Sequence, residues 1–194
     1  MAVISLKNKT KSGSLLVGNT AFIPTDFESI ATVTVGSGGS STISFTSIPS
    51  TYKHLQVRII SRTDRANTYD NIKVNFNADT NANYNYHYLY GDGSAPGSTY
   101  GTSQNFIPLG YTTGDSATSG MFGASIIDIL DYGNTNKYKT TRTLNGNDGN
   151  GSGYIWLSSG AWRDTAAINQ IDLIPYTGTA FKQHSSFTLY GVKG

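Results

Sequence analysis

SSFTLYGVKG, residues 185–194, is the stretch of sequence that decides the fold class. Within it Phe187 and Leu189 alternate with Ser186 and Thr188, so that apolar side chains recur at every second position. This period of two is typical of a β-strand that buries one face and leaves the other polar. We therefore predict a strand here, packed by its apolar face onto a core.

The composition of the whole chain favours the same class of structure. The 194 residues include 22 glycines and 13 tyrosines, together with many serines, threonines and asparagines. These residues disfavour long helices and favour strands joined by tight turns. The length suits one domain of sandwich or barrel type.

Working back along the chain, the same alternation recurs between turn-forming residues. We predict a hairpin of residues 30–35 and 42–46 joined by the glycine-rich residues 36–40. A long loop is predicted over residues 91–102, and the only candidate for a helix is a short one around residues 64–69. Further strands are expected at 53–63, 71–76, 84–90, 121–130, 137–144, 154–158, 167–174 and in the stretch at 185–194.

About ten such strands predict an all-β protein: a two-sheet β-sandwich, jelly-roll-like, with a barrel as the open alternative. Residues 29–194 would form this domain. Residues 1–28 carry no sustained period and are predicted to form an extended N-terminal arm. The arm either adds a strand to its own domain or, as we favour, is donated to a neighbouring subunit. Its apolar residues are the expected partner-binding contacts: Leu15, Leu16, Val17, Phe22 and Ile23.

No catalytic or metal-binding pattern stands out. Cysteine is absent, and the three histidines, His54, His87 and His184, lack the close spacing of metal ligands. Asp128 and Asp131 lie three residues apart on a predicted strand, where side chains point to opposite faces, so they fit an acid pair poorly. There is no nucleophile elbow and no phosphate-binding loop. We predict a non-enzymatic protein with no cofactor and no bound metal.

The glycine-rich and asparagine-rich residues 145–153 allow two interpretations. Their oxygen-bearing side chains resemble a calcium-binding loop, but the segment lacks its acidic residues and closing glutamate. Asn-Gly and Asp-Gly are also strong hairpin signals. We therefore favour a turn.

Charge limits the expected partners. Only 13% of the residues are charged and the formal net charge is +2. Lys7, Lys9 and Lys11 form the densest basic patch, which we interpret as a solvated part of the arm. We expect no nucleic-acid partner, and no apolar run approaches the length of a membrane span.

The tyrosines alternating along residues 84–90 have two interpretations. They can form one wall of a sheet interface, because their rings bury large areas while the hydroxyls stay in water. Exposed aromatic rings can also stack on sugars, which makes glycan binding the alternative function. The candidate contacts for a glycan are Tyr84, Tyr86, Tyr88, Tyr90, Tyr100, Trp156 and Trp162.

Three blocks of the chain resemble a group of tailed-bacteriophage virion proteins. They are residues 48–58 (IPSTYKHLQVR), 125–132 (SIIDILDY) and 187–193 (FTLYGVK), whose order and spacing match that group. The resemblance covers the chain from about Ser29 onward. Residues 12–19 (SGSLLVGN) are similar to a virion attachment arm. Members of the group are described only as structural or tail proteins.

The resemblance implies a non-enzymatic virion structural protein that docks on the capsid or tail through its N-terminal arm. Its partners would be other virion proteins and further copies of itself, with a trimer as the expected assembly. It would be assembled in the host bacterial cytoplasm, which suits a chain without cysteine. The alternative is a glycan-binding receptor-recognition module of a tail fibre.

Overall fold

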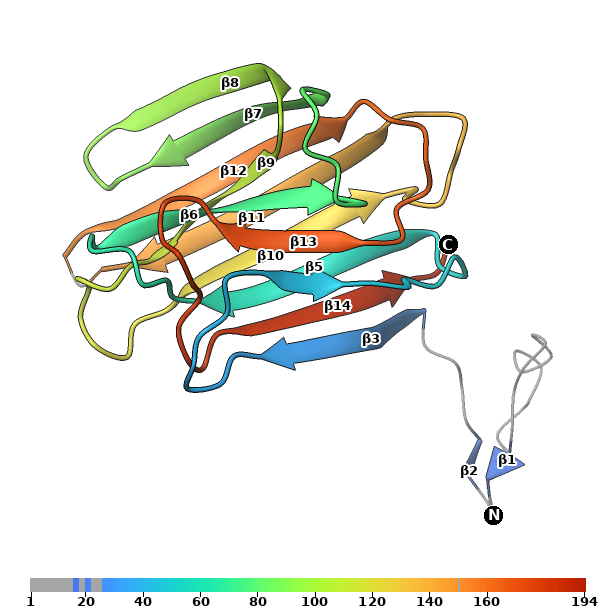
Figure 1. Ribbon diagram of the computed structural model, residues 1–194, viewed down its shortest axis with the longest axis horizontal. Helices are drawn as coiled ribbons and strands as arrows, with labels where there is room; N and C mark the ends of the chain where they lie inside the picture. The colour runs from blue at the N-terminus through green and yellow to red at the C-terminus, as the bar shows by residue number, and fades with distance from the viewer. Residues whose placement is uncertain (1–15, 18–19, 22–25, 150) are drawn as a thin grey trace, which may run out of the picture.

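The computed structural model describes residues 16–17, 20–21, 26–149 and 151–194. All regular elements of this described part are β-strands. Most of them form two antiparallel sheets packed face to face, as Figure 1 shows. The predicted all-β class and two-sheet sandwich are therefore confirmed.

The larger sheet has eight strands in the order β3-β14-β5-β10-β11-β12-β7-β8. The predicted terminal strand lies inside it as β14, paired with β3 on one side and β5 on the other. In spatial order the strands are β3 (Phe27–Thr34), β14 (Ser186–Val192), β5 (His54–Ser61), β10 (Gly123–Leu130), β11 (Lys139–Asp148), β12 (Gly153–Trp162), β7 (Tyr84–Gly91) and β8 (Pro96–Gln104).

The smaller sheet has four strands in the order β4-β13-β6-β9. These are β4 (Ile43–Phe45), β13 (Ile171–Pro175), β6 (Tyr69–Phe76) and β9 (Ile107–Thr113). Two short strands, β1 (Leu16–Val17) and β2 (Thr20–Ala21), pair with each other.

The core lies between the two sheets and follows the predicted alternation. On β5, Leu55, Val57 and Ile59 are buried, and on β14 the same holds for Phe187 and Leu189. Their partners across the sandwich come mainly from the small sheet: Ile43, Phe45, Ile72, Val74, Phe76, Ile107, Leu109, Ile171 and Leu173. Burial of this apolar surface is the dominant stabilising contribution to such a fold.

The predicted hairpin of residues 30–35 and 42–46 is wrong. Its two strands belong to different sheets, because β3 pairs with β14 and β4 pairs with β13. The glycine-rich connection turns the chain from one layer to the other, and Gly39 there has a φ of 70°. The glycine-rich residues form a turn, as predicted, but a turn does not determine which strand pairs with which.

The predicted long loop at residues 91–102 is mostly a strand. β8 begins at Pro96, and a tight turn precedes it in which Asp92 Oδ1 accepts the backbone N–H groups of Ser94 and Ala95, both at 2.9 Å. No helix forms over residues 64–69, and Tyr69 already begins β6. β9 was not predicted at all.

The turn interpretation of residues 145–153 is confirmed in part. β11 and β12 form a hairpin, but they pair as far as Asp148 and Gly153, so residues 145–148 and Gly153 belong to strands. The N–H of Gly149 donates to the carbonyl of Ser152 at 2.5 Å.

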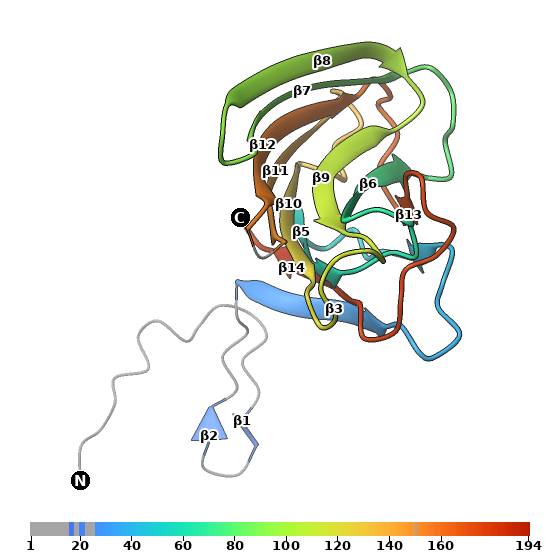
Figure 2. The ribbon, with the colours of Figure 1, turned by 90° about the vertical axis from the view of Figure 1, so that its left-hand side faces the viewer.

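The large sheet extends beyond the small one. Figure 2 shows β7 and β8 lying past β9, the edge strand of the small sheet. The inner face of this overhang is therefore not covered by the described strands of the small sheet, and Tyr86, Tyr88 and Tyr90 of β7 lie on it.

Candidate functional site

The tyrosines of β7 form an aromatic platform on the inner face of the overhang. Tyr86 and Tyr88 have ring centroids 5.8 Å apart and an interplanar angle of 16°, and Tyr88 stacks on Trp156 of β12 with centroids 3.6 Å apart. We call Tyr86, Tyr88, Tyr90 and Trp156 the tyrosine platform.

Two glycines of β8 let the platform rings lie flat against the sheet. A Cβ added to Gly101 would lie 2.5 Å from the ring of Tyr86, and one added to Gly97 would lie 2.3 Å from the ring of Tyr90. A ring thus fills the space above each glycine backbone, as in the aromatic packing that compensates for glycine in sheets. One face of each ring is thereby held against β8.

A second aromatic wall faces the platform. Tyr69 of β6 and Tyr111 of β9 alternate with buried Asp70 and Thr112, so their side chains leave the core side of the small sheet. Tyr111 meets Trp156 edge to face with centroids 5.0 Å apart. The two walls enclose a cleft of about 280 Å³, lined by Arg65, Tyr69, Asn71, Tyr86, Tyr88, Phe106, Pro108, Tyr111, Tyr176 and Thr177.

Tyr86, Tyr88 and Tyr111, which line the cleft, have raised pKa values. Burial raises the pKa of Tyr88 to about 12, and the neighbouring phenols of Tyr111, Tyr86, Tyr90 and Tyr176 add to the rise. Burial likewise raises the pKa of Tyr111 and of Tyr86. At neutral pH Tyr86, Tyr88 and Tyr111 are therefore neutral hydroxyls, each able both to donate and to accept a hydrogen bond.

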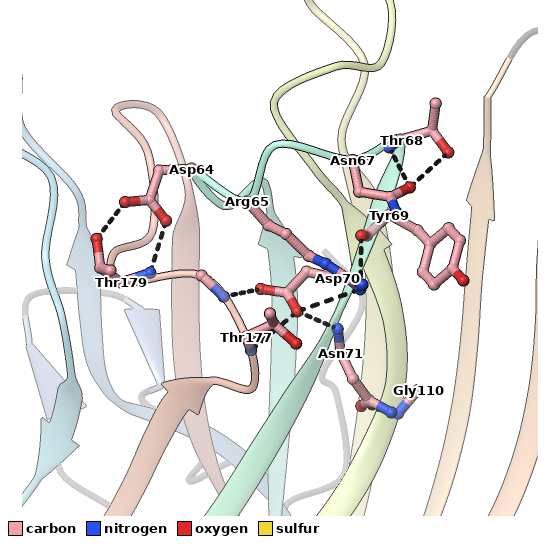
Figure 3. Close-up of polar contacts among 11 residues, drawn as sticks. Asp64, Arg65, Asn67, Thr68, Tyr69, Asp70, Asn71, Gly110, Thr177 and Thr179 are labelled. Atoms are coloured by element: carbon pink, nitrogen blue, oxygen red, sulfur yellow. Dashed lines mark hydrogen bonds and ion pairs between the residues drawn. The ribbon is translucent and has the colours of Figure 1, made fainter.

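Two carboxylates hold the segment that brings Tyr176 to the cleft (Figure 3). Asp70, fully buried, accepts the backbone N–H groups of Thr177 at 3.1 Å and of Gly178 at 2.9 Å. Asp64 accepts those of Thr179 at 2.7 Å and Ala180 at 3.0 Å. Burial alone would raise the pKa of Asp64, but these hydrogen bonds outweigh it and lower the pKa below its ordinary value.

Among the described residues that line the cleft, Arg65 carries the one positive charge, and it already has partners. The guanidinium of Arg65 lies 3.9 Å from the Asp70 carboxylate, donates to the carbonyl of Tyr69 at 3.1 Å and sits 5.1 Å from the centre of the Tyr69 ring. None of these lining residues is a carboxylate. The cleft is thus aromatic and hydroxyl-rich, with little net charge.

Buried polar atoms without a hydrogen-bond partner lie directly behind the platform. Trp156 Nε1, Ser158 Oγ and Asn145 Oδ1 each lack one among the described residues. These residues occupy adjacent positions of β11 and β12, and Trp156 and Ser158 pair with Tyr90 and Tyr88.

The outer face of the large sheet carries a second feature, an apolar band. Leu89, Leu157, Leu144 and Ile126 stand in direct register across β7, β12, β11 and β10. Their exposed fractions are 60%, 51%, 53% and 40%. Alternation normally places polar side chains on the solvent face of an antiparallel sheet. An exposed row of four aliphatic side chains across four strands marks an interaction surface.

Two grooves border the apolar band. One, of about 710 Å³, is lined by residues that include His87, Leu89, Tyr100, Arg142 and Leu157. The other, of about 550 Å³, includes Ile126, Leu144, Tyr154 and Ile155. The band is thus hollowed on both sides and can receive protruding side chains of a partner.

The residues predicted to contact a glycan lie in different parts of the structure. Tyr84, Trp156 and Trp162 are 0%, 1% and 1% exposed, so the prediction of these three residues as surface contacts is wrong. Trp162 donates its indole N–H to Asp79 at 2.7 Å. Tyr86 and Tyr88 line the cleft, whereas Tyr100 lies on the opposite face of the sheet, where it stacks on His87.

The cleft also contains residues that sequence reasoning missed. Tyr69, Phe106, Tyr111 and Tyr176 lie on three separate segments, and no motif links them. The available signal was composition alone, namely the 13 tyrosines.

Of the predicted arm contacts, Leu16 and Val17 form β1. Leu15, Phe22 and Ile23 lie outside the described residues, as do Lys7, Lys9 and Lys11. The domain begins with β3 at Phe27, two residues before the expected start at Ser29.

The remaining polar candidates are engaged in local contacts. Asp128 accepts from Gln56 at 2.9 Å and Arg142 at 3.0 Å, while Asp131 pairs with Lys53 at 2.8 Å. Within the described ranges no three His, Cys, Asp or Glu residues are grouped as a metal site. No helix there is long and apolar enough to cross a membrane.

No protein-family model, curated protein or solved structure matches this chain. Function is therefore argued from the cleft, the apolar band and the three sequence blocks alone.

Proposed function

We propose that this protein is a non-enzymatic structural component of a tailed-phage particle, which joins neighbouring virion subunits through the outer face of its large sheet. The observation that supports it best is the apolar band. Four aliphatic side chains in cross-strand register are exposed to water, and a partner covering them would gain about 25 cal/mol for each Å² of apolar surface removed.

The shape of this face also suits assembly. The band runs across four strands of a sheet, which gives it a broad and rigid support, and a groove borders it on each side. Specific interfaces combine an apolar centre with a polar rim. Arg142 and Asp128, an ion pair on the same face of β11 and β10, occupy the next polar row beside the band.

The sequence resemblance suggests the kind of assembly in which this surface is used. Proteins of the resembled group act by packing against other virion proteins, with an N-terminal arm as attachment and a β-domain as body. The proposed assembly contains several copies of the chain, with a trimer as the expected form, on the capsid or the tail of the particle. Closed symmetric assemblies are the commonest outcome for such surfaces.

The test is the mass of the full chain in solution, measured by light scattering, for the wild type and for the double variant Leu144→Lys, Leu157→Lys. We expect a wild-type oligomer that the double variant converts to a monomer, because two ammonium groups cannot be buried without large cost. Thr140→Lys, an exposed position on the same face of β11, is the matched control and should keep the oligomer.

All three proteins should show the same strand-rich circular dichroism, since the changes are at exposed positions. A wild type that remains monomeric at high concentration would count against the proposal. So would an oligomer whose mass is unchanged in the double variant.

A further inference from the structure

We propose that the cleft between the tyrosine platform and β9 binds a neutral saccharide, inserted as the end of a chain of sugar rings. This goes beyond the structural role, since it uses the opposite face of the large sheet and different residues. Four properties of the cleft favour such a ligand: its shape, the orientation of its rings, its hydrogen-bonding groups and its charge.

The volume of the cleft limits the size of the ligand. A cleft of about 280 Å³ is slightly smaller than most small-molecule sites, for which roughly 300 to 1,000 Å³ is usual. The cleft lies between side chains of β7 and side chains of β9, so the backbones of these two strands fix its width. One or two sugar rings match this space better than a folded protein surface does.

Ring orientation favours stacking. A pyranose has an apolar face of C–H groups that packs on a flat aromatic ring. The platform provides such rings, because Gly97 and Gly101 allow Tyr90 and Tyr86 to lie along the sheet and Trp156 supports Tyr88 from one side. Any residue with a Cβ at position 101 would push the ring of Tyr86 out of this position.

The hydrogen-bonding groups match sugar hydroxyls. Tyr86, Tyr88, Tyr111 and Tyr176 all line the cleft, and the raised pKa values of the first three keep their phenols as neutral donors and acceptors at pH 7. Asn71 and Thr177 line the same space. Every hydroxyl of a sugar needs both a donor and an acceptor, which this lining supplies.

The charge of the residues that line the cleft favours a neutral ligand over an acidic one. Within the described part of the chain, Arg65 is the single cation that lines the cleft, and it faces the buried Asp70 carboxylate at 3.9 Å. Lys73 lies outside the lining, with its ammonium group 5.8 Å and 5.9 Å from the ring centres of Phe106 and Tyr176. We therefore expect binding that changes little between about 50 mM and 500 mM salt.

The experiment starts with the full-length protein on an array of bacterial O-polysaccharide and capsular fragments. The best-binding neutral oligosaccharide then serves as the probe in calorimetric titrations. Tyr176→Ala removes a ring that is 52% exposed at the cleft rim, and it should weaken binding about tenfold or more. Gly101→Ala should have a similar effect, because its Cβ would displace Tyr86.

The matched controls are tyrosines of similar exposure elsewhere. Tyr138→Ala, at a position 56% exposed outside the cleft, and Tyr100→Ala, at one 66% exposed on the opposite face of the sheet, should bind as the wild type does. Thermal unfolding of each variant shows whether the fold is retained. Should Tyr176→Ala fail to fold, Tyr176→Phe replaces it, which keeps the ring and should lose only part of the affinity.

Several results would overturn the proposal. They are an array on which no saccharide binds, binding that Tyr100→Ala abolishes while Tyr176→Ala does not, and preferential binding of a proline-rich peptide, which also fits aromatic grooves. Failure of the structural role is a separate result, because it is judged from the mass of the Leu144 and Leu157 variants.

Discussion

At the scale of single residues, the interior is held by a few polar side chains whose ionisation matters. Tyr84 is fully buried between the sheets; its hydroxyl accepts the N–H of Phe76 at 3.1 Å and donates to the carbonyl of Asp79 at 2.9 Å. Burial raises the pKa of Tyr84 to about 12. The neutral phenol is thus part of the folded structure.

This raised pKa predicts a loss of stability in alkali. In the unfolded chain Tyr84 ionises near its ordinary pKa of 10.0, whereas in the folded protein it stays protonated up to about 12. The stabilisation is therefore complete below pH 10 and is lost as the pH rises from 10 to 12, by on the order of 2 kcal/mol from this residue. Urea unfolding at pH 8, 10 and 11.5 measures it.

Tyr84→Phe is the control for this prediction. It should be less stable than the wild type at pH 8, because the Phe76 N–H loses its partner, and its free energy of unfolding should fall less between pH 10 and 11.5. An equal alkaline fall in both proteins would show that Tyr84 does not carry the effect.

At the scale of elements, the segment between β13 and β14 depends on Asp70 at the start of β6. Asp70 accepts three backbone N–H groups, from Asn71, Thr177 and Gly178. Asp70→Ala should lower the free energy of unfolding by about 3 kcal/mol, since buried donors lose a charged acceptor. It should also release the backbone around Tyr176, seen as faster amide hydrogen exchange at residues 177–180.

The comparison is Asp115→Ala, which removes a surface ion pair with Lys182 whose two side chains are 46% and 41% exposed. Exposed pairs contribute about 0 to 1 kcal/mol, so this variant should be nearly as stable as the wild type. Equal losses in the two variants would contradict the role given to Asp70.

The alternation of apolar and polar residues predicted the strands that bury one face. It did not predict β8 and β9, where glycines interrupt the alternation. Val57 and Phe187 follow the expected alternation and lie in the core. β8 was read as a loop because Pro96, Gly97 and Gly101 are turn residues, yet these glycines make room for tyrosine rings. β9 includes Gly110 at a φ of 101°, a conformation that glycine adopts freely and that breaks the usual strand signal.

The site was only partly predictable for a similar reason. Alternation placed Tyr84, Tyr86 and Tyr88 on one face of a strand, but it could not tell that the first is covered by the small sheet and the others are not. That difference depends on where β9 ends the small sheet, which is set by pairing between distant segments.

At the scale of the whole molecule, the large sheet presents two different surfaces. Its inner overhang forms the tyrosine cleft, and its outer face carries the apolar band. Covering the outer face with a neighbouring subunit leaves the cleft open to solvent. Assembly through one face and ligand recognition on the other are thus compatible in one protein.

Our proposal that the outer face packs against other virion subunits can be tested by cryo-electron microscopy of the intact phage particle. We expect density for the sandwich at repeated positions on the capsid or tail, with Leu89, Leu144 and Leu157 covered by a neighbour. Absence of the protein from purified particles, or density in which these side chains face open solvent, would contradict it.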